Sequence, residues 1–226
     1  KLFHFVELDR TKANLAAGYY ADGRDQWAYD WSIQAVKRSG KYLPEAHWVA
    51  ALSAWRLARF NLSRKHFEAV SGSAYSSPWL VSAGAFWAAR ASIKVRKPML
   101  YNKYLEIASA YPRTFYGILA RRILGLEVKY NWTPPPLEKD ALLELASAPG
   151  GQRAVSLLQI GEDRRAESEL KLLFRTAKPE LARAMMAVAD RADMPSLAMR
   201  IGNMLVASGS SLFDSTAYPA PTLPTN

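Results

Sequence analysis

Apolar side chains recur along this chain at the three- and four-residue spacing of a helix, in paired stretches that repeat. The apolar face around Trp55 is followed by a break and then by a second amphipathic stretch at 64–70. The face around Trp87, 32 residues further on, is followed in the same way by a stretch at 99–110. Alternation typical of strands is scarce. The pattern therefore predicts helical hairpins rather than a sheet.

The C-terminal part repeats this plan in two further helical pairs, expected at 152–160, 164–174, 179–191 and 195–206. A recurrence of about 31–34 residues is typical of proteins built from stacked helical units. Small residues at 83–85 are expected to let neighbouring helices approach closely. We expect an all-α fold, a superhelix (α-solenoid) of antiparallel helical hairpins stacked in sequence order.

Proline-rich segments suggest how the chain is divided. Three consecutive prolines close the segment 131–136, which is predicted to be an extended linker because proline lacks a backbone donor and has a fixed φ. It separates a basic helical part, 1–130, from further hairpins at 137–209. The segment 210–226 is expected to be an extended connector to a domain that lies beyond this sequence.

The positive charge is concentrated in one part of the sequence. The chain has a formal net charge of +10, and residues 46–129 alone carry 13 Lys and Arg against three acidic residues, which also gives +10. This suggests an anionic partner, although an arginine-rich solvated surface would give the same count. No nucleic-acid recognition module is visible, so nucleic acid is not the expected partner.

Several kinds of chemistry have no support in the sequence. The chain has no cysteine, and its three histidines, His4, His47 and His66, are too widely spaced for a metal-binding motif. No phosphate-binding or dinucleotide-binding glycine motif is present, so no cofactor and no metal are expected. No run of 18 apolar residues occurs, so no transmembrane segment is expected.

Three stretches resemble a known family. Residues 108–125 read A-S-A-Y-P-R-T-F-Y-G-I-L-A-R-R-I-L-G, residues 83–91 read A-G-A-F-W-A-A-R-A, and residues 213–221 read F-D-S-T-A-Y-P-A-P. Together and in this order, they resemble the N-terminal superhelical and linker domains of soluble lytic murein transglycosylases. The resemblance implies a ring or horseshoe of helices, a periplasmic location, and a lysozyme-like catalytic domain attached after the connector. It also implies peptidoglycan glycan strands as the partner.

The catalytic centre of that family is not expected on this chain. The family uses a glutamic acid as general acid and base and releases 1,6-anhydro products. Residues 165–170, R-A-E-S-E-L, imitate the opening of its catalytic motif but lack the glycine-rich continuation and precede the connector. We expect Glu167 to form an ordinary helical ion pair with Lys171, and the chain alone to be inactive.

Four residues are the candidate contacts for a glycan strand: Trp87, Arg90, Tyr116 and Arg121. Their rings and charges would form an aromatic and cationic surface if they converge on the concave face of the superhelix, where the charge of 46–129 is expected to lie. In the helix expected to start at Pro112, the side chains of Phe115 and Leu119 are predicted to pack inward. The alternative function is a tetratricopeptide-like solenoid adaptor that binds a protein partner.

Overall fold

The computed structural model describes residues 4–207 and 213–218, which form thirteen helices and no strand. The all-helical prediction is therefore confirmed for this part of the chain. The chain divides into two compact units, Lys1–Val128 and Lys129–Asn226, and we describe each by itself. No described helix combines the length and the apolar character needed to cross a membrane.

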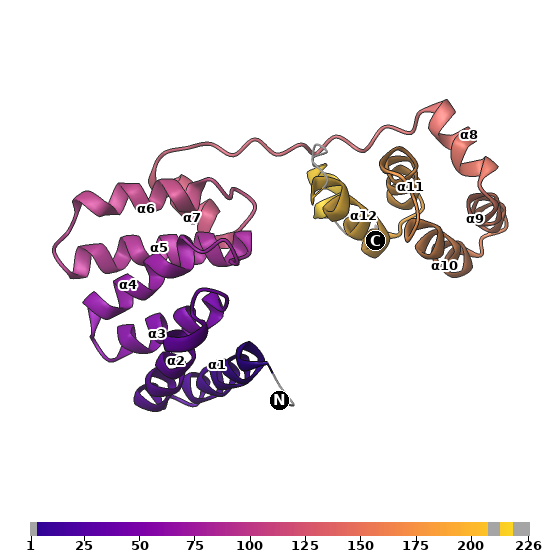
Figure 1. Cartoon of the computed structure of the whole chain (residues 1–226). Coiled ribbons are helices and arrows are strands. Elements are labelled where there is room, and N and C mark those ends of the chain that lie inside the picture. The colour runs from indigo at the N-terminus through magenta and orange to yellow at the C-terminus, as the bar shows by residue number, and fades with distance from the viewer. Residues whose placement is uncertain (1–3, 208–212, 219–226) are drawn as a thin grey trace, which may run out of the picture. The chain divides into compact units, whose positions relative to one another are not determined.

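Unit 1 is a series of helices in which each packs against the next along the chain (Figure 1). They are α1 (Phe5–Ala21), α2 (Asp25–Ser39), α3 (Pro44–Arg56), α4 (Phe60–Ser71), α5 (Pro78–Lys94), α6 (Met99–Ser109) and α7 (Phe115–Ile123). Helix α7 also packs back against α5. The expected packing of hairpins in sequence order is present in this unit.

The odd-numbered helices of unit 1, and α9 (Pro149–Gln159) and α11 (Pro179–Arg191) of unit 2, all end in the same way. The residue after each C-cap has a positive φ, between 51° and 78°, and these residues are Gly23, Ala58, Arg96, Gly125, Gly161 and Asp193. The following N–H then bonds to the carbonyl five residues back, as Arg24 does to Tyr19 at 2.8 Å. This is the Schellman arrangement, which satisfies the last free carbonyls of a helix. In five of the six cases, all but α7, the helix packs against the next helix along the chain, so the loop recurs within five helical hairpins.

Ala58 occupies a backbone conformation that costs an L-residue about 1–2 kcal/mol. We expect Ala58→Gly to raise the free energy of unfolding by about 0.5–1 kcal/mol, because glycine removes this strain but is more flexible when unfolded. Urea denaturation would measure it. Ala17→Gly, at an exposed position inside α1, should instead lower stability by about 1 kcal/mol. Equal losses from both changes would contradict this account of the loop.

The core of unit 1 lies between α3, α4 and α5. Phe67 is fully buried, and its ring stacks against Trp87 with centroids 5.8 Å apart and meets Trp48 edge-on at 5.5 Å. A Cβ on Gly84 would lie 2.7 Å from Val70 Cγ1, so only glycine lets α5 approach α4 this closely. Gly84, one of the small residues at 83–85, therefore allows the close approach of neighbouring helices that was expected.

Unit 2 contains a second set of helices: α8 (Lys139–Ser147), α9 (Pro149–Gln159), α10 (Asp163–Phe174), α11 (Pro179–Arg191), α12 (Pro195–Ala207) and α13 (Asp214–Ala217). Helix α9 packs against α10, and α11 packs against α12 and α8. Leu170, Met185 and Ile201 are fully buried in its core. The four helices predicted here from periodicity are present, with ends shifted by at most three residues.

The proline segment is fixed to unit 2 by hydrogen bonds. The backbone N–H of Asn131 donates to Asp214 Oδ2 at 2.6 Å, and the Asp214 N–H donates to the Asn131 carbonyl at 2.8 Å. The Arg191 guanidinium donates to the Pro135 carbonyl at 3.1 Å. Residues 131–136 have no helical structure, as expected, but these contacts show that they are part of unit 2.

The connector is not extended throughout. Within the predicted extended segment 210–226, the structure describes residues 213–218, and α13 occupies four of them. Asp214 and Thr216 are fully buried, and α13 packs against α12. The carboxylate of Asp214 has a backbone donor from the proline segment, which makes its burial tolerable. Residues 210–212 and 219–226 lie outside the described part.

Two predictions for the block around α7 were wrong. The helix begins at Phe115 rather than Pro112, because the Thr114 side chain accepts a hydrogen bond from the Gly117 N–H and caps it there. Phe115 is 60% exposed rather than buried. Tyr116 takes the inward position, and successive helical side chains differ by about 100° in direction, so its neighbour points outward. Leu119 is half-buried against the core, as predicted.

Candidate functional site

Two of the four predicted contact residues form a cation–aromatic pair on α5. The Arg90 guanidinium lies 4.2 Å from the ring centroid of Trp87 and 5.4 Å from that of Trp55. The two tryptophan rings meet edge-on, with centroids 5.1 Å apart. Arg90 is exposed, whereas both rings are half-buried. The rings therefore hold an accessible guanidinium in a defined position.

The other two predicted contacts serve the packing of α7. Tyr116 lies against Phe86, with ring centroids 5.2 Å apart. Arg121 donates to the carbonyls of Ser109, at 3.3 Å, and Glu127, so its guanidinium ties α7 to α6 and to the chain that follows. Among the described residues, no hydrogen bond, ion pair or ring contact joins them to Trp87 or Arg90.

The block 114–117, T-F-Y-G, has a structural explanation. Thr114 Oγ1 lies 2.8 Å from Ser82 Oγ on α5, which ties the start of α7 to that helix. A Cβ on Gly117 would lie 1.9 Å from the Tyr111 carbonyl oxygen, so the turn before α7 closes only over a glycine. The block thus fixes α7 on α5.

Unit 1 has further cation–aromatic contacts that the sequence analysis did not predict. Three of them, Arg38 with Phe5, Lys41 with Tyr42 and Lys103 with Tyr104, lie elsewhere in the unit. In the other four, Arg56 lies 4.3 Å from the ring of Tyr20, Arg59 lies 5.4 Å from that of Tyr29, Arg24 lies over Trp27, and Lys94 lies over Phe60. These four lie where odd helices end and even helices begin, near the α1–α2, α3–α4 and α5–α6 loops; Figure 1 shows the last two on the left of unit 1. We call these residues, with Trp55, Trp87 and Arg90, the cationic edge.

Hydrogen bonds join neighbouring hairpins along the cationic edge. Arg56 Nε lies 2.9 Å from Asp25 Oδ1, and its Nη1 donates to the Tyr20 carbonyl at 3.0 Å. Arg59 Nη2 donates to Gln26 Oε1 at 2.8 Å. Burial raises the pKa of Tyr29, with Arg59 acting in the opposite direction, so its phenol is neutral at neutral pH. The sequence signal was the occurrence of Arg or Lys and aromatic residues together in three segments, 20–30, 55–60 and 87–97.

Glu167 is not placed as a catalytic acid. Its carboxylate pairs with Lys171 at 2.7 Å, four residues along α10, as predicted. A general acid needs a carboxyl group enclosed in an apolar pocket, where the neutral form is favoured. The Glu167 side chain is instead partly exposed and held by Lys171 on the surface of α10.

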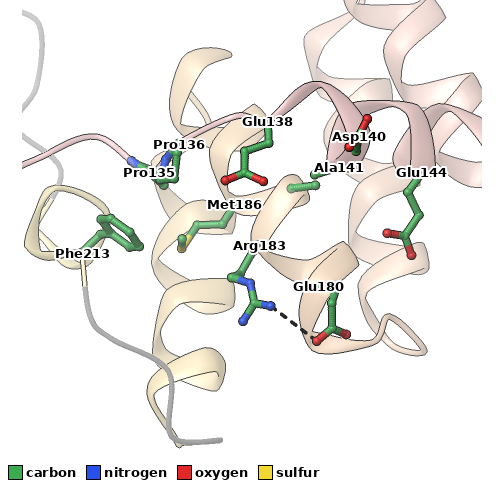
Figure 2. Close-up of a pocket in the computed structure, with 11 residues that line it drawn as sticks. Pro135, Pro136, Glu138, Asp140, Ala141, Glu144, Glu180, Arg183, Met186 and Phe213 are labelled. Atoms are coloured by element: carbon green, nitrogen blue, oxygen red, sulfur yellow. Dashed lines mark hydrogen bonds and ion pairs between the residues drawn. The ribbon is translucent and has the colours of Figure 1, made fainter.

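Unit 2 has a cavity of about 380 Å³ between the proline segment, α8 and α11 (Figure 2). Four acidic residues line it, namely Glu138, Asp140, Glu144 and Glu180, together with Arg183, Met186 and Phe213. Arg183 lies 3.4 Å from Glu180, as the dashed line shows. All four carboxylates are exposed, so the cavity lacks the enclosure that a catalytic acid requires.

No group of three or more His, Asp or Glu residues suited to a metal ion occurs in the described part of the chain. His47 and His66 do meet, with their Nδ1 atoms 3.0 Å apart. Burial lowers the pKa of both rings, and that of His66 falls to about 4, with His47 contributing. Both rings are therefore neutral at neutral pH and add no charge to unit 1.

No model of a protein family matches the chain, and no curated protein matches it in sequence.

Proposed function

We propose that this chain is the superhelical scaffold of a periplasmic soluble lytic transglycosylase. In this role it holds peptidoglycan glycan strands for an attached lysozyme-like catalytic domain and has no catalytic residue of its own. The resemblance at 83–91, 108–125 and 213–221 supports the family. The repeated hairpins, each closed by the same loop, support a superhelical scaffold.

The observation that carries the substrate-holding role is the Trp87–Arg90 pair. An exposed guanidinium held over half-buried rings is pre-organised to bind carboxylate, and peptidoglycan peptides carry carboxylates. Tyr116 and Arg121 were also predicted to contact the glycan strand, but Tyr116 packs on α5 and Arg121 bonds to the end of α6, which gives both a supporting role. The substrate contacts of this proposal are therefore Trp87 and Arg90.

The chain should bind insoluble peptidoglycan without cleaving it. We expect purified sacculi to retain it at low salt, because the charges of unit 1 are unscreened there, and to release it at high salt. Analysis of the soluble products should find no 1,6-anhydro sugars, because Glu167 is tied up in an ion pair. Glu167→Gln is the control and should bind equally. Release of anhydro products that this change abolishes would overturn the proposal.

A second function, a tetratricopeptide-like adaptor for a protein partner, is favoured by a different observation. Six odd-numbered helices end in one loop geometry, which is the regularity expected of a helical repeat protein whatever it binds. Sacculus binding separates the two functions. An adaptor of this type would remain in the supernatant at every salt concentration.

A further inference from the structure

We infer that the cationic edge is the surface on which unit 1 docks the peptide carboxylates of a glycan strand. The inference rests on the proposed function and names the contact surface within it. It extends the binding surface from Trp87 and Arg90 on α5 to the loop ends of three successive hairpins.

The edge carries an excess of positive charge. Its three segments, 20–30, 55–60 and 87–97, contain seven Lys and Arg and three Asp, a net charge of +4. Arg56 is paired with Asp25. Among the described residues, Arg90 and Lys94 have no ion-pair partner, and both are exposed beside aromatic rings. Their charge is thus available to an anion from solution.

The rings of the edge favour carboxylate over nucleic acid. Proteins that bind single-stranded nucleic acid stack bases on free aromatic faces. Here cations occupy those positions, with Arg90 against Trp55 and Trp87 and Arg56 against Tyr20. The edge presents the guanidinium of Arg90, a planar group that can donate two parallel hydrogen bonds to a carboxylate.

The opposite ends of the helices also carry exposed aromatic rings and lysines. Tyr42 and Tyr75 meet edge-on there, with centroids 5.3 Å apart, and Trp79 is also exposed. Lys41 lies over Tyr42, and Lys37 is exposed nearby in the last turn of α2. Because unit 1 has exposed lysines at both ends of its hairpins, it provides a charge-matched control.

The test compares Arg90→Gln/Lys94→Gln on the cationic edge with Lys37→Gln/Lys41→Gln at the opposite ends. Both variants lose two exposed positive charges, and thermal unfolding by circular dichroism would show that both are folded. Binding to sacculi is measured in about 0.1 M and about 1 M salt, since screening is weak in the first and strong in the second. Poly-L-glutamate, neutral chitooligosaccharides and single-stranded DNA serve as soluble competitors.

We expect the edge variant to bind sacculi about ten-fold more weakly at low salt and the control variant to bind like the unmodified chain. Poly-L-glutamate should compete, and chitooligosaccharides should not. Equal losses of sacculus binding in the two variants would overturn the inference, because the total positive charge of unit 1, and not the cationic edge, would then explain binding. Competition by chitooligosaccharides but not by poly-L-glutamate would overturn it too, as would stronger competition by DNA than by poly-L-glutamate.

The same experiment separates this inference from the proposed function. If the unmodified chain ignores sacculi but binds poly-L-glutamate, and the edge variant loses that binding, the peptidoglycan function fails while the carboxylate preference of the edge stands. If all variants bind sacculi equally, the inference fails and the proposed function stands.

Discussion

Replacing Gly117 by alanine should lower the free energy of unfolding of unit 1 by about 3 kcal/mol, the upper part of the range for overpacking. The new Cβ would lie 1.9 Å from the Tyr111 carbonyl oxygen and 2.8 Å from Thr114 Oγ1. The first clash is with backbone, which cannot rotate away as a flexible side chain can. The second disrupts the hydroxyl that caps α7 and contacts Ser82, so α7 should loosen from α5.

Urea denaturation followed by tryptophan fluorescence would measure this loss. Six of the seven tryptophans lie in Lys1–Val128, so the signal reports mainly on unit 1. Gly18→Ala is the matched control, because a Cβ there meets nothing within 4 Å and α1 continues through the position. It should raise stability by about 0.5–1 kcal/mol. If Gly117→Ala does not lower the free energy of unfolding either, the Tyr111 carbonyl cannot lie this close to position 117.

Replacing Phe67 by alanine should cost about 3–5 kcal/mol, the usual range for removing a large buried aromatic side chain. Phe67 is fully buried between Trp48 and Trp87, so truncation removes apolar contacts and leaves a cavity in the middle of unit 1. The same denaturation experiment applies. Arg90 should also become less well positioned, because the Trp87 ring beneath it loses its stacking partner.

Phe115→Ala provides the comparison, since it deletes the same side chain from the same unit. Phe115 is 60% exposed, so its loss should change stability by no more than about 0.5 kcal/mol. A loss as large as that of Phe67→Ala would show that Phe115 is buried after all, as the sequence had suggested. The ratio of the two losses in free energy of unfolding thus shows how far burial, rather than residue type, determines what removal of a phenylalanine side chain costs.

Periodicity alone was sufficient to predict most of the helices. Apolar spacing located α9 to α12 to within a few residues. Such patterns are reliable because one helical face must be apolar to pack, whatever its partner is. The ion pair between Glu167 and Lys171 was predictable for a similar reason, since residues four apart in a helix are always neighbours.

The direction of single side chains at helix ends depended on the tertiary structure. Phe115 and Tyr116 are adjacent aromatic residues of similar size, and the packing of α7 on α5 decides which of them faces Phe86. The positive φ at Ala58 and Arg96 also had no sequence signal, because alanine and arginine are not typical of that conformation. In both loops, the hairpin packing on either side imposes the turn.

The sequence by itself determined that this chain is helical, that its helices come in pairs, and that its charge lies mostly in 46–129. Only the tertiary structure placed Arg90 over Trp55 and Arg56 over Tyr20, residues that are 35 and 36 positions apart. The physical reason is that the two features depend on interactions over different distances along the sequence. Helical periodicity is set by hydrogen bonds over four residues, whereas contacts between hairpins depend on the rotation and offset with which helices pack, which no local pattern specifies.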